Sequence, residues 1–299
     1  MADQSNATGT DIAECGVSYI KAPTGWCCAD PNPFTEDGSY GQRWSAFCIE
    51  DRDDGQFMTG HVGQGPFCAR FGRGVDHLEN RLADFLRYER RYNRTVILCL
   101  HDEFDADRVV ARALNRTPAH SVVRVADPEI VVHSTTQHAW ESIRADCELR
   151  AASRLTIEDG RISAGSLTPS KVTRYYDSEP PEYPDYIMFG KIDEVGPEMV
   201  VASRAAGAFV LDPDATYTPG VRLYFDHHRM IREGWATRDG LHMVKVYDRL
   251  PLEPYLLAAV SVDDLDPSGG MAPWTLRAFV AKSNAWIEHC DAIHRLRRC

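Results

Sequence analysis

Apolar residues in the first part of the chain alternate between short strand-like runs and helical repeats. Residues 44–49 (WSAFCI) and 95–100 (TVILCL) have the length and apolar character of buried strands. Between these runs, the apolar residues of the segment 75–88 fall on one helical face, and residues 106–114 show a second helical pattern. This alternation of strands and helices predicts an α/β region.

The remaining chain is richer in strand patterns. A short apolar strand over residues 129–132 precedes a helix from about Gln137 to Asp146, in which Trp140 and Ile143 point inward. The same spacing rules predict a helix at 275–296, and strands at 122–125, 186–189, 199–203, 208–211 and 221–225.

The length of 299 residues favours two domains or one elaborated domain. We place a boundary near Pro118. It divides an N-terminal α/β region of unknown role, residues 1–117, from a second domain, residues 118–299. The predicted fold class of the whole chain is therefore α/β, in its α+β form.

Composition and charge exclude several classes of protein. With 43% hydrophobic and 26% charged residues, the chain has the composition of a soluble globular protein. No apolar run approaches the roughly 18 residues of a membrane span, so we expect no membrane partner. The net charge of −11 opposes non-specific nucleic-acid binding, because such binding needs a basic surface. The polar, acidic first residues do not resemble a presequence, so we expect an intracellular protein, cytoplasmic or nuclear.

Neither the cysteines nor the acidic residues give a convincing metal site. The nine cysteines are odd in number and have no CxxC spacing, so neither a zinc site nor a disulfide framework is predicted. Asp226-His227-His228 spells the start of a DHH phosphoesterase motif, whose other carboxylates are not visible. A cluster that could bind a metal follows the predicted strand 95–100 and consists of His101, Asp102, Glu103, Asp105 and Asp107. Acids at this position more often begin a solvated helix, so we expect a metal-independent protein.

The segment 131–155 carries the most chemical information. It places His133 after a strand, with Ser134 and Thr135 following directly. A histidine at a strand end can hydrogen-bond a ribose, while the backbone of the small residues beside it holds a planar amide. Arg154 lies near the end of the segment, and its guanidinium group suits bidentate binding of a phosphate.

This order of residues resembles the NAD site of the ADP-ribosyltransferase fold, and in particular that of the tRNA 2′-phosphotransferase family. The family stretch reads roughly H-G-T, then A-W-x-x-I, then G-L and an arginine. The residues that fill this pattern in order are His133, Thr135, Trp140, Ile143, Leu149 and Arg154. A second match has a strand ending in an acid, a short helix, a glycine and a turn. Its members are Phe225-Asp226, the helix 227–233, Gly234 and Arg238-Asp239-Gly240.

The resemblance implies a split β-sheet, NAD as the cofactor and chemistry at the nicotinamide ribose. In this scheme His133 orients a ribose hydroxyl, and the backbone at Ser134 and Thr135 holds the nicotinamide amide. Arg154 neutralises phosphate. Tyr224, or a tyrosine from the loop 175–186, stacks on the nicotinamide ring. The implied activity is RNA 2′-phosphate transfer, so RNA or another phosphate-bearing acceptor is the expected partner besides NAD.

Departures from the family pattern leave the acceptor open. Ser134 replaces the usual glycine, the segment 155–157 lacks the family's histidine, and residues 216–219 lack its second arginine. Arg87 and Arg204 are therefore the candidates for binding a substrate phosphate. The alternatives are ADP-ribose transfer to another acceptor in nucleic acid or protein, NAD hydrolysis, a non-catalytic module that binds NAD or ADP-ribose, and an interaction protein with no NAD site.

Overall fold

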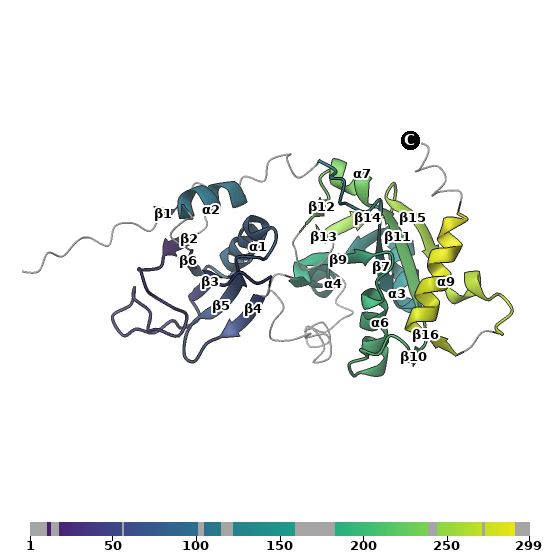
Figure 1. Ribbon diagram of the computed structural model, residues 1–299, viewed down its shortest axis with the longest axis horizontal. Helices are drawn as coiled ribbons and strands as arrows, with labels where there is room; N and C mark the ends of the chain where they lie inside the picture. The colour runs from purple at the N-terminus through teal and green to yellow at the C-terminus, as the bar shows by residue number, and fades with distance from the viewer. Residues whose placement is uncertain are drawn as a thin grey trace, which may run out of the picture. The chain divides into compact units, whose positions relative to one another are not determined.

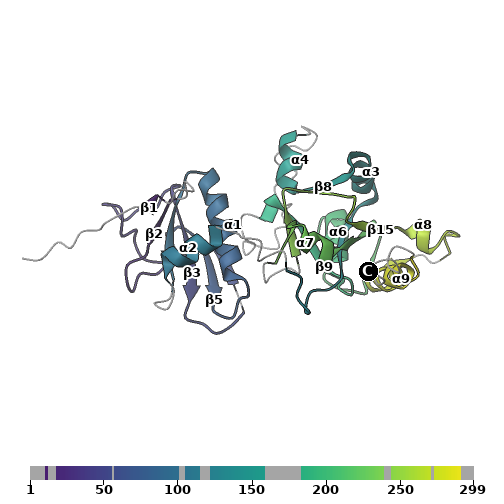
Figure 2. The same cartoon turned by 90° about the horizontal axis from the view of Figure 1, so that it is seen from above.

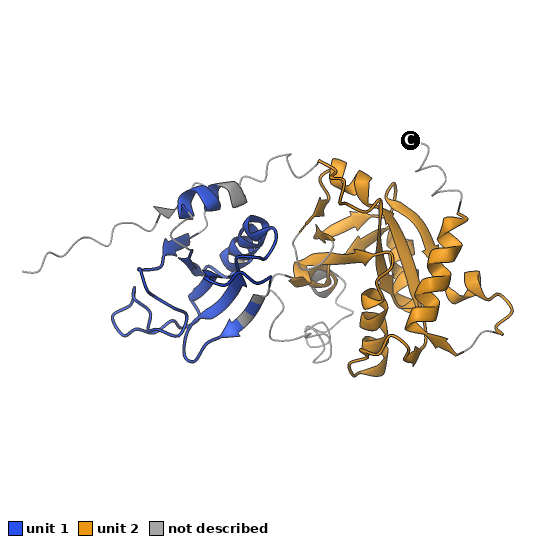
Figure 3. Cartoon of the chain, in the orientation of Figure 1, with its two compact units in different colours: residues 1–116, 176–182 blue, residues 117–175, 183–299 orange. Residues whose placement is uncertain are grey.

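The chain divides into two compact units, which Figure 3 distinguishes by colour. Unit 1 comprises residues 1–116 with 176–182, and unit 2 comprises residues 117–175 with 183–299. The division falls beside the boundary expected near Pro118, and hydrophobic clusters form separately in each unit. The computed structural model describes residues 11–12, 18–55, 57–100, 105–114, 122–158, 183–238, 244–270 and 273–290.

Unit 1 is built on a six-stranded sheet in the order β1-β2-β6-β3-β5-β4 (Figure 1). Strands β2, β6, β3 and β5 run parallel, and β1 and β4 join the edges antiparallel. The helices of this unit are α1 (Leu78–Arg91) and α2 (Ala106–Leu114). The strands are β1 (Asp11–Ile12), β2 (Ser18–Lys21), β3 (Trp44–Glu50), β4 (Phe57–His61), β5 (Phe67–Gly72) and β6 (Thr95–Cys99).

Side-chain alternation along β3 builds a core on each face of this sheet. Phe47 and Ile49 pack in the cluster that contains the apolar residues of α1 and α2. Ala46 and Cys48 point the other way and pack against Trp26 of the loop between β2 and β3. Both faces are buried, which explains why β3 reads as a continuous apolar run.

Unit 2 contains a second six-stranded sheet, in the order β12-β13-β9-β7-β11-β15, whose described neighbours all pair antiparallel. β7 pairs with β11 along its whole length but with β9 only at Val131 and Val132. The sheet is therefore nearly divided between β7 and β9. The strands are β7 (Ile130–Thr135), β9 (Tyr186–Lys191), β11 (Val221–Asp226), β12 (Ala236–Thr237), β13 (Val244–Tyr247) and β15 (Leu256–Val260).

One face of this sheet is covered by α9 (Leu276–Glu288) and α6 (Gly196–Ala206). Val132, Tyr224 and Val260 pack there with Ile287 of α9. Helix α6 follows β9 and lies against β7. The small strands β10 (Thr216–Tyr217) and β16 (Trp274–Thr275) pair with each other, and β16 leads directly into α9.

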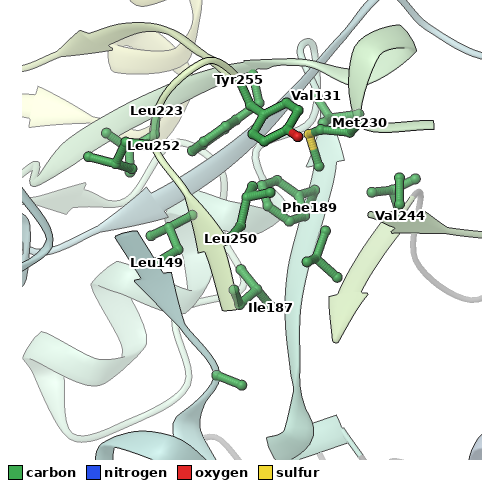
Figure 4. Packing of buried hydrophobic residues seen from close by; sticks show 14 of the residues in the cluster. Val131, Leu149, Ile187, Phe189, Leu223, Met230, Val244, Leu250, Leu252 and Tyr255 are labelled. Atoms are coloured by element: carbon green, nitrogen blue, oxygen red, sulfur yellow. The ribbon is translucent and has the colours of Figure 1, made fainter. Parts of the chain in front are cut away.

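The other face is covered by a two-stranded ribbon of β8 (Glu148–Arg150) and β14 (Arg249–Pro251). Leu149 and Leu250 of the ribbon pack in one cluster with Ile187, Phe189 and Val131 (Figure 4). Viewed from above, α3 (Gln137–Asp146), α4 (Ala152–Glu158) and β8 lie together, away from α9 (Figure 2). The remaining elements are the 3-10 turn Tyr183–Asp185, α7 (His227–Arg232) and α8 (Val262–Leu265).

Most of the predicted elements are confirmed. Within the described residues, no helix is long and apolar enough to cross a membrane. The helix predicted from residue 75 begins at Leu78, because His77 has a positive φ of 58° and Val75 lies in the preceding turn. The helix predicted to reach 296 ends at Glu288, and residues 291–299 lie outside the described residues. The confirmed strands are those predicted at 44–49, 95–100, 186–189 and 221–225, and the confirmed helices are those at 106–114, 137–146 and 227–233.

Three predicted strands are wrong. Residues 199–203 lie inside α6, which has Pro197 in its first turn and ends at Gly207, where φ is 64°. Residues 122–125 and 208–211 have no regular structure. Val122, Val125, Phe209 and Leu211 are exposed, whereas Val123 packs partly buried against the core of unit 2. A short apolar run predicts a strand only if a neighbouring strand pairs with it, and this partner is not visible in a local pattern.

Candidate functional site

His133 lies inside β7 rather than after it, because the strand continues to Thr135 before α3 begins. Its ring centroid is 5.8 Å from that of Phe189. Its Nδ1 atom is 2.9 Å from the carbonyl oxygen of Met188 in β9. The pairing of β7 with β9 ends at Val132. The side chain of His133 therefore bridges the two strands where they separate.

The surroundings of His133 determine its protonation. A carbonyl oxygen only accepts hydrogen bonds, so Nδ1 carries the proton and Nε2 is the acceptor of the neutral ring. Burial lowers the pKa of His133, the Met188 carbonyl raises it, and the cation of Arg204 lowers it. The ring is therefore neutral near pH 7. A neutral imidazole with Nε2 as its acceptor suits a hydroxyl donor.

The side chains of Ser134 and Thr135 are both buried, and that of Ser134 belongs to a polar network. The Ser134 hydroxyl donates to Oε1 of Glu198, 2.5 Å away. Glu198 also accepts hydrogen bonds from Tyr217 at 2.9 Å and from Arg222 at 3.1 Å. The Ser134 hydroxyl is therefore held within this network.

Arg154 lies in α4 and forms a two-pronged ion pair with Asp248. Its Nη2 atom is 2.9 Å from Oδ2 of Asp248, and its Nε atom also donates to that carboxylate. Asp248 has a positive φ of 70° between β13 and β14, and its carbonyl accepts from the amide of Ala151 at 2.8 Å. The ion pair and this backbone bond fix the start of α4 to the corner between β13 and β14.

An open pocket of about 240 Å³ is lined by Arg154 together with Arg150, Arg249 and Glu148. Arg150 and Arg249 lie opposite each other on β8 and β14. Glu148 is 2.6 Å from Arg150 and 4.0 Å from Arg249. Three guanidinium groups gather here, and besides Glu148 they pair with Asp248 at Arg154 and with Asp146, 3.5 Å from Arg150. Arg150 and Arg249 were not predicted, because only the pairing of two three-residue strands brings them to Arg154.

His133 and this pocket belong to the same side of the sheet. Val131 and His133 are two residues apart on β7 and therefore point to the same face. Val131 packs in one cluster with Leu149 of β8 and Leu250 of β14, the strands that carry the pocket. The immediate partners of the two site residues differ: they are Met188 and Phe189 for His133, and Asp248 for Arg154.

Tyr224 is placed on the opposite face. It pairs in register with Val132, whereas His133 pairs with Leu223. Tyr224 is 0% exposed, and its hydroxyl donates to Oδ1 of Asn284 in α9 at 2.9 Å. Burial raises the pKa of Tyr224 to about 12. The structure thus separates Tyr224 from His133 by the thickness of the sheet, and a stacking role beside His133 does not fit this position.

The two arginines considered for the substrate phosphate lie in different units. Arg87 is in α1 of unit 1, with Nη1 3.8 Å from Oδ1 of Asp84. Arg204 is an exposed residue near the end of α6, close enough to His133 for its charge to lower the pKa of that ring. Arg222 of β11 is fully buried and bound to Glu198.

The DHH sequence has a structural explanation. Asp226 caps α7, with Oδ1 accepting from the amide of Arg229 at 2.9 Å. The rings of His227 and His228 bond the carbonyl oxygens of Pro128 and Asp127. Asp226 thus begins α7, and the two histidine rings fix α7 to the chain before β7.

Of the acidic residues that follow β6, Asp105 begins α2 by accepting hydrogen bonds from the amides of Asp107 and Arg108. Asp107 forms an ion pair with Lys21. His101, Asp102 and Glu103 lie outside the described residues, as do Asp239 and Gly240 of the second matched motif. The described acids thus have the helix-start role that the sequence favoured.

Comparison with known proteins adds no assignment. No family model matches the chain, and no curated protein or solved structure matches it either.

Proposed function

We propose that this chain is an NAD-dependent transferase that acts at the nicotinamide ribose, most like an RNA 2′-phosphotransferase. The observation that carries the proposal is the state of His133. Its Nδ1 is tied to the Met188 carbonyl at 2.9 Å, and burial keeps the ring neutral. The ring thus presents Nε2 as a fixed acceptor for a ribose hydroxyl.

The arginine pocket supports the same proposal. NAD supplies an electrophilic ribose carbon with nicotinamide as the leaving group, so the protein needs to orient the ribose and balance phosphate charge rather than supply a strong base. Arg154, Arg150 and Arg249 line a pocket on the side of the sheet that carries His133. We assign the NAD pyrophosphate or the acceptor phosphate to these three guanidinium groups.

The sheet of unit 2 is consistent with the split sheet of the ADP-ribosyltransferase fold that we propose for it. The pairing of β7 with β9 stops after two positions, and β7 stays paired with β11 along its length. Backbone groups of β7 beyond Val132 thus face a break in the sheet rather than a continuous ladder. A planar amide could bind at such a break by the β-strand hydrogen bonds that β9 does not make.

The proposal is tested first by NAD binding. His133→Ala and Arg154→Ala should each raise the dissociation constant for NAD at least about tenfold. This is the size of one charge-assisted contact of about 1.4 kcal/mol. Matched controls exist in the same unit. His138 on α3 is an exposed histidine, and Arg277 forms a similar but exposed ion pair with Asp214. Equal affinities for the two site variants, the two controls and the wild type would rule out the assignment.

Analysis of the reaction product identifies the acceptor of the proposed transfer. Labelled NAD is incubated with and without an RNA that bears an internal 2′-phosphate, in excess EDTA. Release of nicotinamide with ADP-ribose 1″,2″-cyclic phosphate supports the phosphotransferase. Free ADP-ribose or a labelled macromolecule would reject it in favour of NAD hydrolysis or ADP-ribosylation of nucleic acid or protein. Activity that EDTA abolishes and a divalent metal restores would overturn the metal-independent mechanism.

A second candidate is a binding module without catalysis. It is favoured by the ion pair of Arg154, because Asp248 takes the two nitrogens with which the guanidinium group would grip a phosphate. NAD or ADP-ribose binding without nicotinamide release identifies this alternative. Under either proposal we place the protein inside the cell, in the cytoplasm or the nucleus, where NAD is present and thiols stay reduced.

A further inference from the structure

Four cysteines from separate parts of unit 1 meet on the face of its sheet that α1 and α2 do not cover. Cys48, Cys68 and Cys99 come from β3, β5 and β6, and Cys28 comes from the loop between β2 and β3. The Sγ atoms of Cys28 and Cys48 are 3.1 Å apart, and Cys48 is in register with Cys99 on the next strand. All four are free thiols.

The contacts make these thiols chemically unequal. Its contact with Cys48, and then that with Cys68, lowers the pKa of Cys28 to about 4. The same contacts, together with burial, raise the pKa of Cys48 and of Cys68. The positive charge of Arg70 also favours ionisation of Cys28. The Cys68 thiol donates to the carbonyl oxygen of Pro66 at 3.3 Å, and hydrogen bonding to Cys48 also lowers the pKa of Cys99.

We propose that Cys28 and Cys48 are a peroxide-responsive pair that forms a reversible disulfide. The Cys28 thiolate attacks hydrogen peroxide, breaks its O–O bond and becomes a sulfenic acid, and the hydroxide that leaves is protonated to water. The Cys48 thiol then displaces the sulfenic hydroxyl as a second water and closes the S–S bond. In sum two thiols lose two electrons and two protons, and hydrogen peroxide is reduced to two waters.

Geometry favours this pair over the others. The two sulfur atoms need to approach by only about 1 Å to reach a bond of roughly 2.05 Å. Cys28 lies in a loop, whereas Cys48 and Cys99 both lie on paired strands, where a shift of one sulfur involves the ladder. Cys28 is 6% and Cys48 3% exposed, so a small oxidant has better access than a bulky disulfide such as glutathione. The bond would join the loop between β2 and β3 to the central strand.

The test uses the full chain and limited hydrogen peroxide, followed by unfolding, alkylation of the remaining thiols and peptide mass spectrometry. The expected result is loss of two thiols per chain, a linked pair of peptides containing Cys28 and Cys48, and recovery of both thiols with dithiothreitol. A Cys27→Ser background places the bond on Cys28 rather than on its neighbour. The pair should react at least about tenfold faster than the exposed Cys147 of unit 2, since the thiolate is the nucleophile.

Two variants separate attack from closure. In Cys48→Ser, dimedone should trap a sulfenic acid at Cys28. In Cys28→Ser, neither the trapped acid nor the disulfide should form, with the fold checked by circular dichroism. If that variant does not fold, the wild-type peptide map decides alone. Oxidation of Cys147 before Cys28, or a disulfide that maps to any other pair, would overturn the proposal.

Discussion

At the scale of single residues, two histidines show how burial controls charge in unit 2. His227 is 0% exposed, and its Nδ1 atom is 2.8 Å from the carbonyl oxygen of Pro128. Its Nε2 atom is buried and has no hydrogen-bond partner within the described residues. Burial lowers the pKa of His227, as it does for His133. Both rings are therefore neutral in the folded protein near pH 7.

Acid should destabilise the protein through these rings. Their pKa values are lower in the folded than in the unfolded chain, where a histidine titrates near 6.5. The unfolded chain then binds more protons between the folded value and 6.5. The contribution of these neutral rings to the free energy of unfolding is thus complete above pH 6.5, and it falls as the pH drops toward the folded pKa. One histidine contributes at most about 1.4 kcal/mol per pH unit to this slope.

Urea unfolding of His227→Gln at pH 8, 7, 6 and 5 checks this prediction. The variant lacks the titrating ring, so the stability difference between wild type and variant should shrink as the pH falls. His138→Gln removes an exposed histidine whose side chain is 94% accessible, and it should leave the slope unchanged. A stability difference for His227→Gln that does not vary with pH would contradict the role of burial.

At the scale of elements, close backbone packing fixes the end of β7 that follows His133. Gly220 immediately precedes β11 and lies against this end. A Cβ atom added there would be 1.9 Å from the carbonyl oxygen of Thr135 and 2.9 Å from the Cα of Thr136. Both neighbours are main-chain atoms, so no side-chain rotation relieves the clash. The backbone at Ser134 and Thr135 depends on this approach.

Gly220→Ala should therefore destabilise unit 2 by about 1–3 kcal/mol, the usual cost of overpacking. It should also weaken NAD binding, because the end of β7 moves. Denaturant unfolding and calorimetric titration measure the two effects. The matched control is Gly196→Ala at the start of α6, where an added Cβ meets nothing within 4 Å. Wild-type stability and affinity in Gly220→Ala would show that the strand end adjusts at no cost.

The elements also show how far local patterns can predict. Runs such as 95–99 were predictable because apolar character, length and flanking residues agree. The run 199–203 has the same apolar character, but the proline and glycine at the two ends of α6 bound a helix. The face on which Tyr224 lies depends on its register with Val132. The β8–β14 ribbon, and with it Arg150 and Arg249, depends on pairing across about 100 residues, which one sequence does not reveal.

At the scale of the whole molecule, the two units have separate cores. The clusters of unit 1 and those of unit 2 share no residue. Leu82 of α1 and Leu223 of β11 are both 0% exposed and lie in different clusters. Units with independent cores can unfold independently unless a large apolar interface couples them.

We therefore expect a core substitution to destabilise only its own unit. Leu82→Ala and Leu223→Ala should each cost about 2–5 kcal/mol, because each leaves a cavity in a closed core. Hydrogen exchange with peptide mass spectrometry separates the two units. Leu82→Ala should accelerate exchange of the protected amides of β3 and β6 and leave those of β7 and β11 unchanged, and Leu223→Ala should do the reverse. Equal acceleration in both sheets by either variant would show that the chain unfolds as one cooperative body.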